Sequence, residues 1–115
     1  MFELNPHLID ADLVVLCTPL YYFGFSAQLK LVIDRFYAIN SQLHSPRDAV
    51  LLAAAWNTND WTFPALAHHY ETLVRYMGWR DVGQILGTGC GTRSACESSE
   101  FPKLAYELGK KVCAA

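Results

Sequence analysis

The segment that decides the fold has the sequence Leu13-Val14-Val15-Leu16-Cys17-Thr18-Pro19-Leu20-Tyr21-Tyr22-Phe23-Gly24. Its first six residues are nearly continuously apolar and include two adjacent valines, which is typical of a strand covered on both faces in a parallel sheet. Ser26 is placed to cap a following helix, whose apolar residues recur at helical spacing (Leu29, Val32, Ile33 and Phe36). The segment therefore predicts a strand, an aromatic turn and a helix in succession.

The same alternation occurs twice more along the chain. A second apolar strand is predicted from Ala49 to Ala55, followed by the loop Trp56 to Trp61 and a helix that Thr62 and Pro64 open and Gly78 ends. A third strand is predicted from Val82 to Leu86, then a glycine-rich loop, a polar stretch through Glu100, and a last helix from Pro102 with Leu104, Leu108 and Val112 on one face. Strand and helix in regular alternation predict an open parallel α/β sheet in a single domain spanning residues 1–115.

The amino-acid composition indicates which binding partners are not expected. The 115 residues are 52% hydrophobic and 17% charged, with a formal net charge of −2 and no cluster of basic residues, so nucleic acid is not an expected partner. No apolar run approaches the roughly 20 residues that cross a bilayer, and the first ten residues do not resemble a signal peptide. We therefore expect a cytoplasmic protein without a membrane partner.

Three kinds of site are not supported by residue spacing. The four cysteines lack a CxxC pair, so structural or incidental thiols are expected rather than disulfides or metal. Neither Cys17 nor Cys90 begins the Cys-x5-Arg motif of a phosphatase. The adjacent His68 and His69 would point about 100° apart on a helix, which disfavours a shared metal.

Residues Asp12 to Gly24, with Ser26-Ala27-Gln28-Leu29-Lys30 and Asp34-Arg35, resemble the third strand, the Pro-x-Tyr turn and the next helix of flavodoxin-like NAD(P)H-dependent FMN reductases and quinone reductases. Ala105 to Lys110 is similar to that family's closing helix. Members typically begin with a strand, a phosphate-binding loop, a helix and a second strand, which have no counterpart here. The resemblance implies the carboxyl-terminal portion of such a protein, with a truncated three-stranded flavodoxin-like sheet, FMN as cofactor and NAD(P)H as reductant.

The resemblance also implies which residues contact the flavin. They are Pro19, Leu20, Tyr21, Tyr22, Phe23 and Gly24 in the first loop, and Trp56 and Asn57 in the second. Aromatic faces suit the isoalloxazine ring, and Gly24 permits close backbone approach. No catalytic residue is named, because the flavin accepts the hydride and the protein positions it. The alternative is that these aromatics are ordinary packing residues.

The family's phosphate loop has no evident substitute. Gly87-x-Gly89-x-Gly91 lacks the spacing of a dinucleotide-binding loop and is expected to be a flexible connection. On the flavodoxin strand order 2-1-3-4-5, removal of the first two strands leaves Leu13 to Cys17 at an edge, which is a template for pairing. We expect either a homodimer through this edge or an amino-terminal partner chain.

Three functions remain open at this point. The leading one is hydride transfer through bound FMN to a small-molecule acceptor. The second is a truncated, non-catalytic module that acts through oligomerisation or partner binding. The third is one half of a split reductase.

Overall fold

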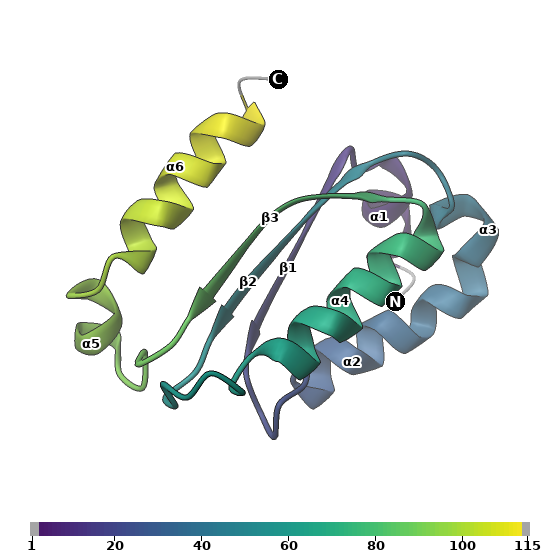
Figure 1. Ribbon diagram of the computed structural model, residues 1–115. Helices are drawn as coiled ribbons and strands as arrows, with labels where there is room; N and C mark the ends of the chain where they lie inside the picture. The colour runs from purple at the N-terminus through teal and green to yellow at the C-terminus, as the bar shows by residue number, and fades with distance from the viewer. Residues whose placement is uncertain (1–2, 114–115) are drawn as a thin grey trace.

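The computed structural model describes residues 3–113, which form a three-stranded parallel sheet flanked by helices (Figure 1). The strands are β1 (Leu13–Pro19), β2 (Asp48–Ala54) and β3 (Arg80–Gly87), arranged in the order β1-β2-β3. β1 pairs with β2 without interruption from Leu13 opposite Asp48 to Pro19 opposite Ala54. The predicted open parallel α/β sheet is therefore confirmed, and β1 lies at its edge.

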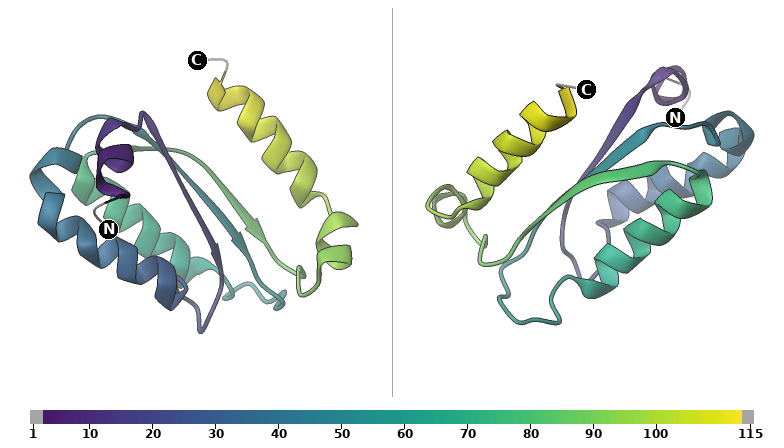
Figure 2. Two further views of the ribbon diagram at one scale, coloured as in Figure 1. Left: turned by 180° about the vertical axis from the view of Figure 1, so that it is seen from behind. Right: turned by 45° about the horizontal axis from the view of Figure 1, so that its top comes forward.

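The two crossovers cover the same face of the sheet. Between β1 and β2 the chain forms α2 (Ala27–Asp34), the 3-10 helix η1 (Arg35–Ile39) and α3 (Asn40–Leu43), and between β2 and β3 it forms α4 (Pro64–Met77). Helix α6 (Phe101–Cys113) follows β3 and lies on the opposite face (Figure 2). Both crossovers are right-handed and both advance from β1 toward β3. They therefore place α2 and α4 on the same face of the sheet.

Local signals set the helix ends. The Ser26 hydroxyl accepts a hydrogen bond from the Leu29 N–H at 3.2 Å and caps α2, as predicted. Lys30 and Asp34 form an ion pair at 2.5 Å, one turn apart. Gly78 adopts φ 72° and ends α4, a backbone conformation that glycine takes without steric cost.

The core lies between the sheet and the α2/α4 layer. Leu51, Leu66 and Tyr70 are fully buried there. Two hydrogen bonds join this layer to its surroundings: the Trp79 indole N–H donates to the Leu43 carbonyl at 2.8 Å, and the Tyr70 hydroxyl lies 3.0 Å from Asp81 Oδ1. The polar groups of Trp79 and Tyr70 are thus paired where the apolar layer ends, whereas the hydroxyl of the fully buried Thr62 has no hydrogen-bond partner among residues 3–113.

The expectation that β1 is covered on both faces was wrong. Val14, Leu16 and Thr18 are buried under the helices, whereas the alternate residues are exposed, with Val15 at 47%. α6 packs against β3 and does not extend over β1. One face of the first two strands is therefore only partly covered within the described residues.

The sequence analysis named no helix at α3, which follows η1, nor at two further places. These two are α1 (Asn5–Asp10), which precedes β1, and α5 (Arg93–Glu97), which occupies the polar stretch before the last helix. α5 is opened by Thr92, whose hydroxyl accepts the Ala95 N–H at 3.1 Å. Both helices are short and have no buried residue, so they carry no apolar period that could reveal them.

Smaller differences concern the helix faces and boundaries. The predicted face of α6 is confirmed at Leu108 and Val112, which are partly buried together with Phe101 and Ala105, whereas Leu104 is 44% exposed. Thr62 is buried ahead of α4, and Phe63 occupies the cap position with Pro64 in the first turn. Among the described helices of residues 3–113, none has the length and apolar character needed to cross a membrane.

Candidate functional site

The first loop is a tight turn with strained backbone. The Tyr21 N–H donates to the Gly24 carbonyl at 3.4 Å, and the Gly24 N–H donates back to the Tyr21 carbonyl at 3.2 Å. Between them Tyr22 and Phe23 have φ values of 47° and 68°, in the left-handed region that bulky residues rarely occupy. Such residues each cost about 1–3 kcal/mol and cluster at functional sites.

This turn presents aromatic rings to solvent. Tyr22 is 99% exposed, and Tyr21 is exposed as well. Phe23 is partly covered by Trp61, with ring centroids 5.6 Å apart. Of the aromatics in this stretch, only Phe25 is buried, edge-on to His69 at 4.9 Å. The interpretation as packing residues therefore holds for Phe25 and not for Tyr21 or Tyr22.

The second loop meets the first across a cavity. Trp56 is 80% exposed at the end of β2. A cavity of about 210 Å³ lies between the two loops and is lined by Leu20, Tyr22, Phe23, Ala55, Trp56 and Asn57. The structure thus brings together Leu20, Tyr22, Phe23, Trp56 and Asn57 from the predicted set.

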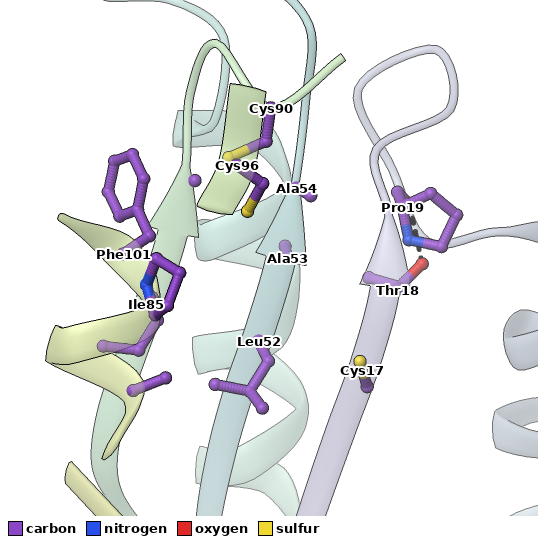
Figure 3. A pocket seen from close by; sticks show the side chains of 13 residues that line it. Cys17, Thr18, Pro19, Leu52, Ala53, Ala54, Ile85, Cys90, Cys96 and Phe101 are labelled. Atoms are coloured by element: carbon purple, nitrogen blue, oxygen red, sulfur yellow. Dashed lines mark hydrogen bonds between the residues drawn. The ribbon is translucent and has the colours of Figure 1, made fainter. Parts of the chain in front are cut away.

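The other predicted residues lie differently. Tyr21 and Gly24 make the turn and do not line this cavity. Pro19 lines a separate groove on the partly covered sheet face (Figure 3). Ala55 lines the cavity and was not predicted, because a small apolar residue at a strand end carries no chemical signal.

The third loop braces the second. The Cys90 N–H donates to the Ala55 carbonyl at 2.8 Å, and the Gly89 N–H donates to the Asn57 carbonyl at 3.3 Å. A Cβ on Gly91 would stand 2.1 Å from Trp56 Cδ1, so the backbone touches the indole ring. The loop that was expected to be flexible is instead tied to Ala55, Trp56 and Asn57.

The chemistry of the lining suits stacking rather than proton transfer. Apart from Asn57 its side chains are aromatic and aliphatic, and their polar groups are the Tyr22 hydroxyl, the Trp56 indole N–H and the Asn57 amide. Within residues 3–113 no group of three His, Cys, Asp or Glu side chains is arranged to hold a metal ion. Burial and a hydrogen bond to Cys96 raise the pKa of the nearby Cys90 thiol, which disfavours the reactive thiolate.

The sequence was compared with models of protein families and with characterised proteins. The sequence model of the family "NADPH-dependent FMN reductase" matches residues 1–89. The Bacillus subtilis (strain 168) protein YwqN, named as an NAD(P)H-dependent FMN-containing oxidoreductase, is 27% identical over 90 residues, which are 71% of this chain and 50% of YwqN. The chain therefore spans about half the length of this relative.

Solved structures share the fold. A structure titled as the Trp repressor binding protein from Bacillus subtilis superposes with a TM-score of 0.79 at 22% identity, over 93% of this chain and 68% of that one. A flavone reductase superposes with a TM-score of 0.66 at 14% identity, over 94% of this chain and 42% of that one. With the family match over most of its length, this open parallel α/β chain belongs to the NADPH-dependent FMN reductase family and has a flavodoxin-like fold.

Proposed function

We propose that this chain provides the ring-binding side of an FMN site in an NAD(P)H-dependent FMN or quinone reductase. The observation that carries the proposal is the strained turn at Tyr22 and Phe23, which holds exposed rings beside Trp56 across the cavity. Backbone strain of this kind persists only where the surrounding structure fixes it. Family membership supports the choice of ligand.

The residues at the cavity fit the isoalloxazine ring. Tyr22, Phe23 and Trp56 offer flat faces for stacking. The backbone N–H groups of Tyr22 and Phe23 have no hydrogen-bond partner among residues 3–113, so they are available to the polar edge of the ring. The Asn57 amide adds both a donor and an acceptor.

When bound, FMN would supply hydride chemistry, taking a hydride from NAD(P)H and passing it to a small-molecule acceptor. The role of this chain is to bind and orient. Trp56 and Tyr22 would shield the faces of the flavin ring from water. The backbone N–H groups of the turn would hold the ring in place by donating hydrogen bonds to its polar edge. No side chain at the cavity is needed as an acid or base.

The residues at the cavity are suited to binding the flavin ring and not to binding the phosphate group of FMN. The backbone N–H groups of Gly89 and Cys90 are already bonded to Asn57 and Ala55, and Gly91 is in contact with Trp56. This loop therefore braces the ring side of the cavity and does not form a free cradle of donors. We expect the chain alone to bind riboflavin about as well as FMN.

The organisation of the assembled protein belongs to the same proposal. We propose that residues 1–115 act as one partial flavodoxin-like domain and that the β1 edge is paired in the working protein, by a second copy or by an amino-terminal partner chain. The competing function is a non-catalytic module that uses the same edge for association and binds no flavin.

Quenching of flavin fluorescence tests the proposal. The purified chain is titrated into FMN and into riboflavin, and Tyr22→Ala is compared with Tyr37→Ala, which removes another exposed tyrosine, 88% exposed and located in η1. We expect saturable quenching of both flavins, with Tyr22→Ala roughly fivefold weaker, since an aromatic contact contributes about 1 kcal/mol. Absence of quenching, or equal loss in both variants, would favour the non-catalytic module.

A further inference from the structure

Helix α5 turns a single side chain inward, and that side chain is a thiol. Of its five residues only Cys96 is not exposed. Cys96 lines the groove at the carboxyl end of the sheet, and Cys90 of the third loop lines the same end (Figure 3). Both cysteines are free thiols. The short helix therefore brings a second thiol to the loop that braces the candidate site.

The two thiols are in direct contact. The Cys90 and Cys96 side chains share a hydrogen bond, and Figure 3 shows them next to each other. On its other side the Cys90 thiol is confined by β3, because a Cβ at Gly87 would stand 3.2 Å from Cys90 Sγ. Backbone hydrogen bonds hold both residues, from the Cys90 N–H to the Ala55 carbonyl at 2.8 Å and from the Cys96 N–H to the Thr92 carbonyl at 3.1 Å.

The two halves of this pair differ in how firmly they are held. Cys90 is bonded to Ala55 at the cavity, and the next residue, Gly91, lies against Trp56. α5 has no buried residue, so it can shift without disturbing a packed core. A bond between the two sulfurs would therefore move α5 and leave Cys90 where it braces the second loop.

We propose that Cys90 and Cys96 form a redox-active dithiol that a small-molecule disulfide oxidises, and that the resulting protein disulfide holds the third loop against Trp56. One protein thiolate attacks the small disulfide RS–SR, so that a mixed disulfide forms and RS⁻ leaves. The second thiolate attacks the protein sulfur of the mixed disulfide and displaces the second RS⁻. The two protein thiols lose two electrons, and their two protons end on two RSH molecules.

Cys96 is the thiol that attacks first. Burial and the contact with Cys96 raise the pKa of the Cys90 thiol, so Cys90 is seldom the thiolate in the reduced pair. Once Cys96 carries the RS group, its negative charge no longer acts on Cys90. Cys90 can then ionise and complete the bond. The inference concerns the thiols and does not depend on flavin binding.

Oxidised glutathione is the probe that tests the proposal. The dilute chain is equilibrated with mixtures of reduced and oxidised glutathione, the remaining thiols are blocked with N-ethylmaleimide, and the peptides are mapped by mass spectrometry. We expect a disulfide between Cys90 and Cys96, and glutathione adducts at the exposed Cys17 and Cys113, which serve as internal controls. The equilibrium constant for this disulfide should be at least about tenfold greater in the folded chain than in urea, because folding holds the two thiols together.

Single variants test the order of the two steps. Cys90→Ser should accumulate a glutathione adduct on Cys96, whereas Cys96→Ser should leave Cys90 modified at least about tenfold more slowly than Cys96. Cys90→Ala repeats the test if serine disturbs the fold at this confined position.

Hydrogen exchange tests the effect on the third loop. In the oxidised chain the amides of residues 87–91 should exchange at least about tenfold more slowly than in the reduced chain. The Cys96→Ser variant, exposed to the same glutathione mixture, should show no such change.

Three results would overturn the proposal. They are glutathione adducts on both cysteines without a bond between them, equal equilibrium constants in the folded and unfolded chain, and unchanged hydrogen exchange of residues 87–91 after oxidation. None of these results alters quenching of riboflavin by the reduced chain, so failure of the dithiol and failure of flavin binding can be told apart.

Discussion

The backbone of Gly91 lies against the indole ring of Trp56 so closely that a Cβ at Gly91 would stand 2.1 Å from Trp56 Cδ1. The third loop therefore fixes the ring that the second loop presents to the cavity. Nothing larger than hydrogen fits at this position unless the indole moves. The contact joins two loops that are far apart in the sequence and adjacent at the same end of the sheet.

Replacing Gly91 with alanine should displace the Trp56 ring and weaken flavin quenching several-fold, with little change in global stability because Trp56 is exposed. Tryptophan emission and flavin titration measure the two effects. Gly109→Ala is the matched control, since a Cβ there meets no atom within 4 Å. A Gly91→Ala variant with unchanged flavin affinity would show that the ring position is unimportant for binding.

Tyr22→Gly should separate stability from function. Tyr22 has φ 47° and a fully exposed ring, so glycine relieves backbone strain and stabilises the fold by about 1 kcal/mol while the stacking ring is lost. Urea unfolding should show the gain, and flavin titration should show the loss. Tyr22→Ala removes the ring and keeps the strain, so equal stability of the two variants would mean that this backbone is not strained.

Tyr70→Phe should lower the free energy of unfolding by about 1 kcal/mol, because it removes the hydrogen bond from the buried hydroxyl to Asp81. Tyr76→Phe, which alters an exposed hydroxyl bonded to Asn40, should change it by less than about 0.5 kcal/mol. Urea denaturation at neutral pH compares the two variants. Equal losses would contradict a special role for the buried pair.

We also expect the buried Tyr70 to make the folded chain less stable at alkaline pH. Burial, followed by the charge of Asp81, raises the pKa of Tyr70 above its ordinary value of 10.0. The unfolded chain then releases the proton before the folded chain does, so stability is present below pH 10 and decreases as the pH rises above it. The free energy of unfolding, measured by urea denaturation at several pH values from 8 to 11, should decrease less steeply with pH for Tyr70→Phe than for the unmodified chain.

We expect His69 to make the folded chain less stable at mildly acidic pH. Partial burial, followed by the charge of Lys30, lowers the pKa of His69 below 6.5, and its ring packs on Phe25. Because the unfolded chain binds the proton first, stability decreases as the pH falls below about 6.5 and through the lowered pKa. His69→Gln should reduce this decrease between pH 7.5 and 5, with His68→Gln as the control for removing an imidazole from the same turn.

Local sequence was sufficient for elements with a strong period or a defined end. The apolar run at Leu13, the cap at Ser26 and the stop at Gly78 each act within a few residues, and each was confirmed. Elements without buried residues were missed, as α5 shows. The phase of α6 was also misjudged at Leu104, because the contact of Leu108 with Gly83 sets which side faces the sheet.

The candidate site was predictable in composition and not in arrangement. The sequence pointed to the aromatic loop and to Trp56, but the left-handed backbone at Tyr22 and Phe23 and the placement of Pro19 in a separate groove follow from how the loop closes. The contact between Gly91 and Trp56 likewise joins loops separated by a whole strand and helix.

The sequence by itself determined an alternating parallel α/β chain, because hydrophobic period and turn residues act locally. The edge position of β1 was an expectation from the family resemblance, and the strand order of the structure confirms it. Only the tertiary structure decided which side of β1 is covered. The direction of both crossovers places α2 and α4 on one face and leaves Val15 and Cys17 exposed on the other. Handedness of connection is a property of the whole sheet, and no single segment of sequence carries it.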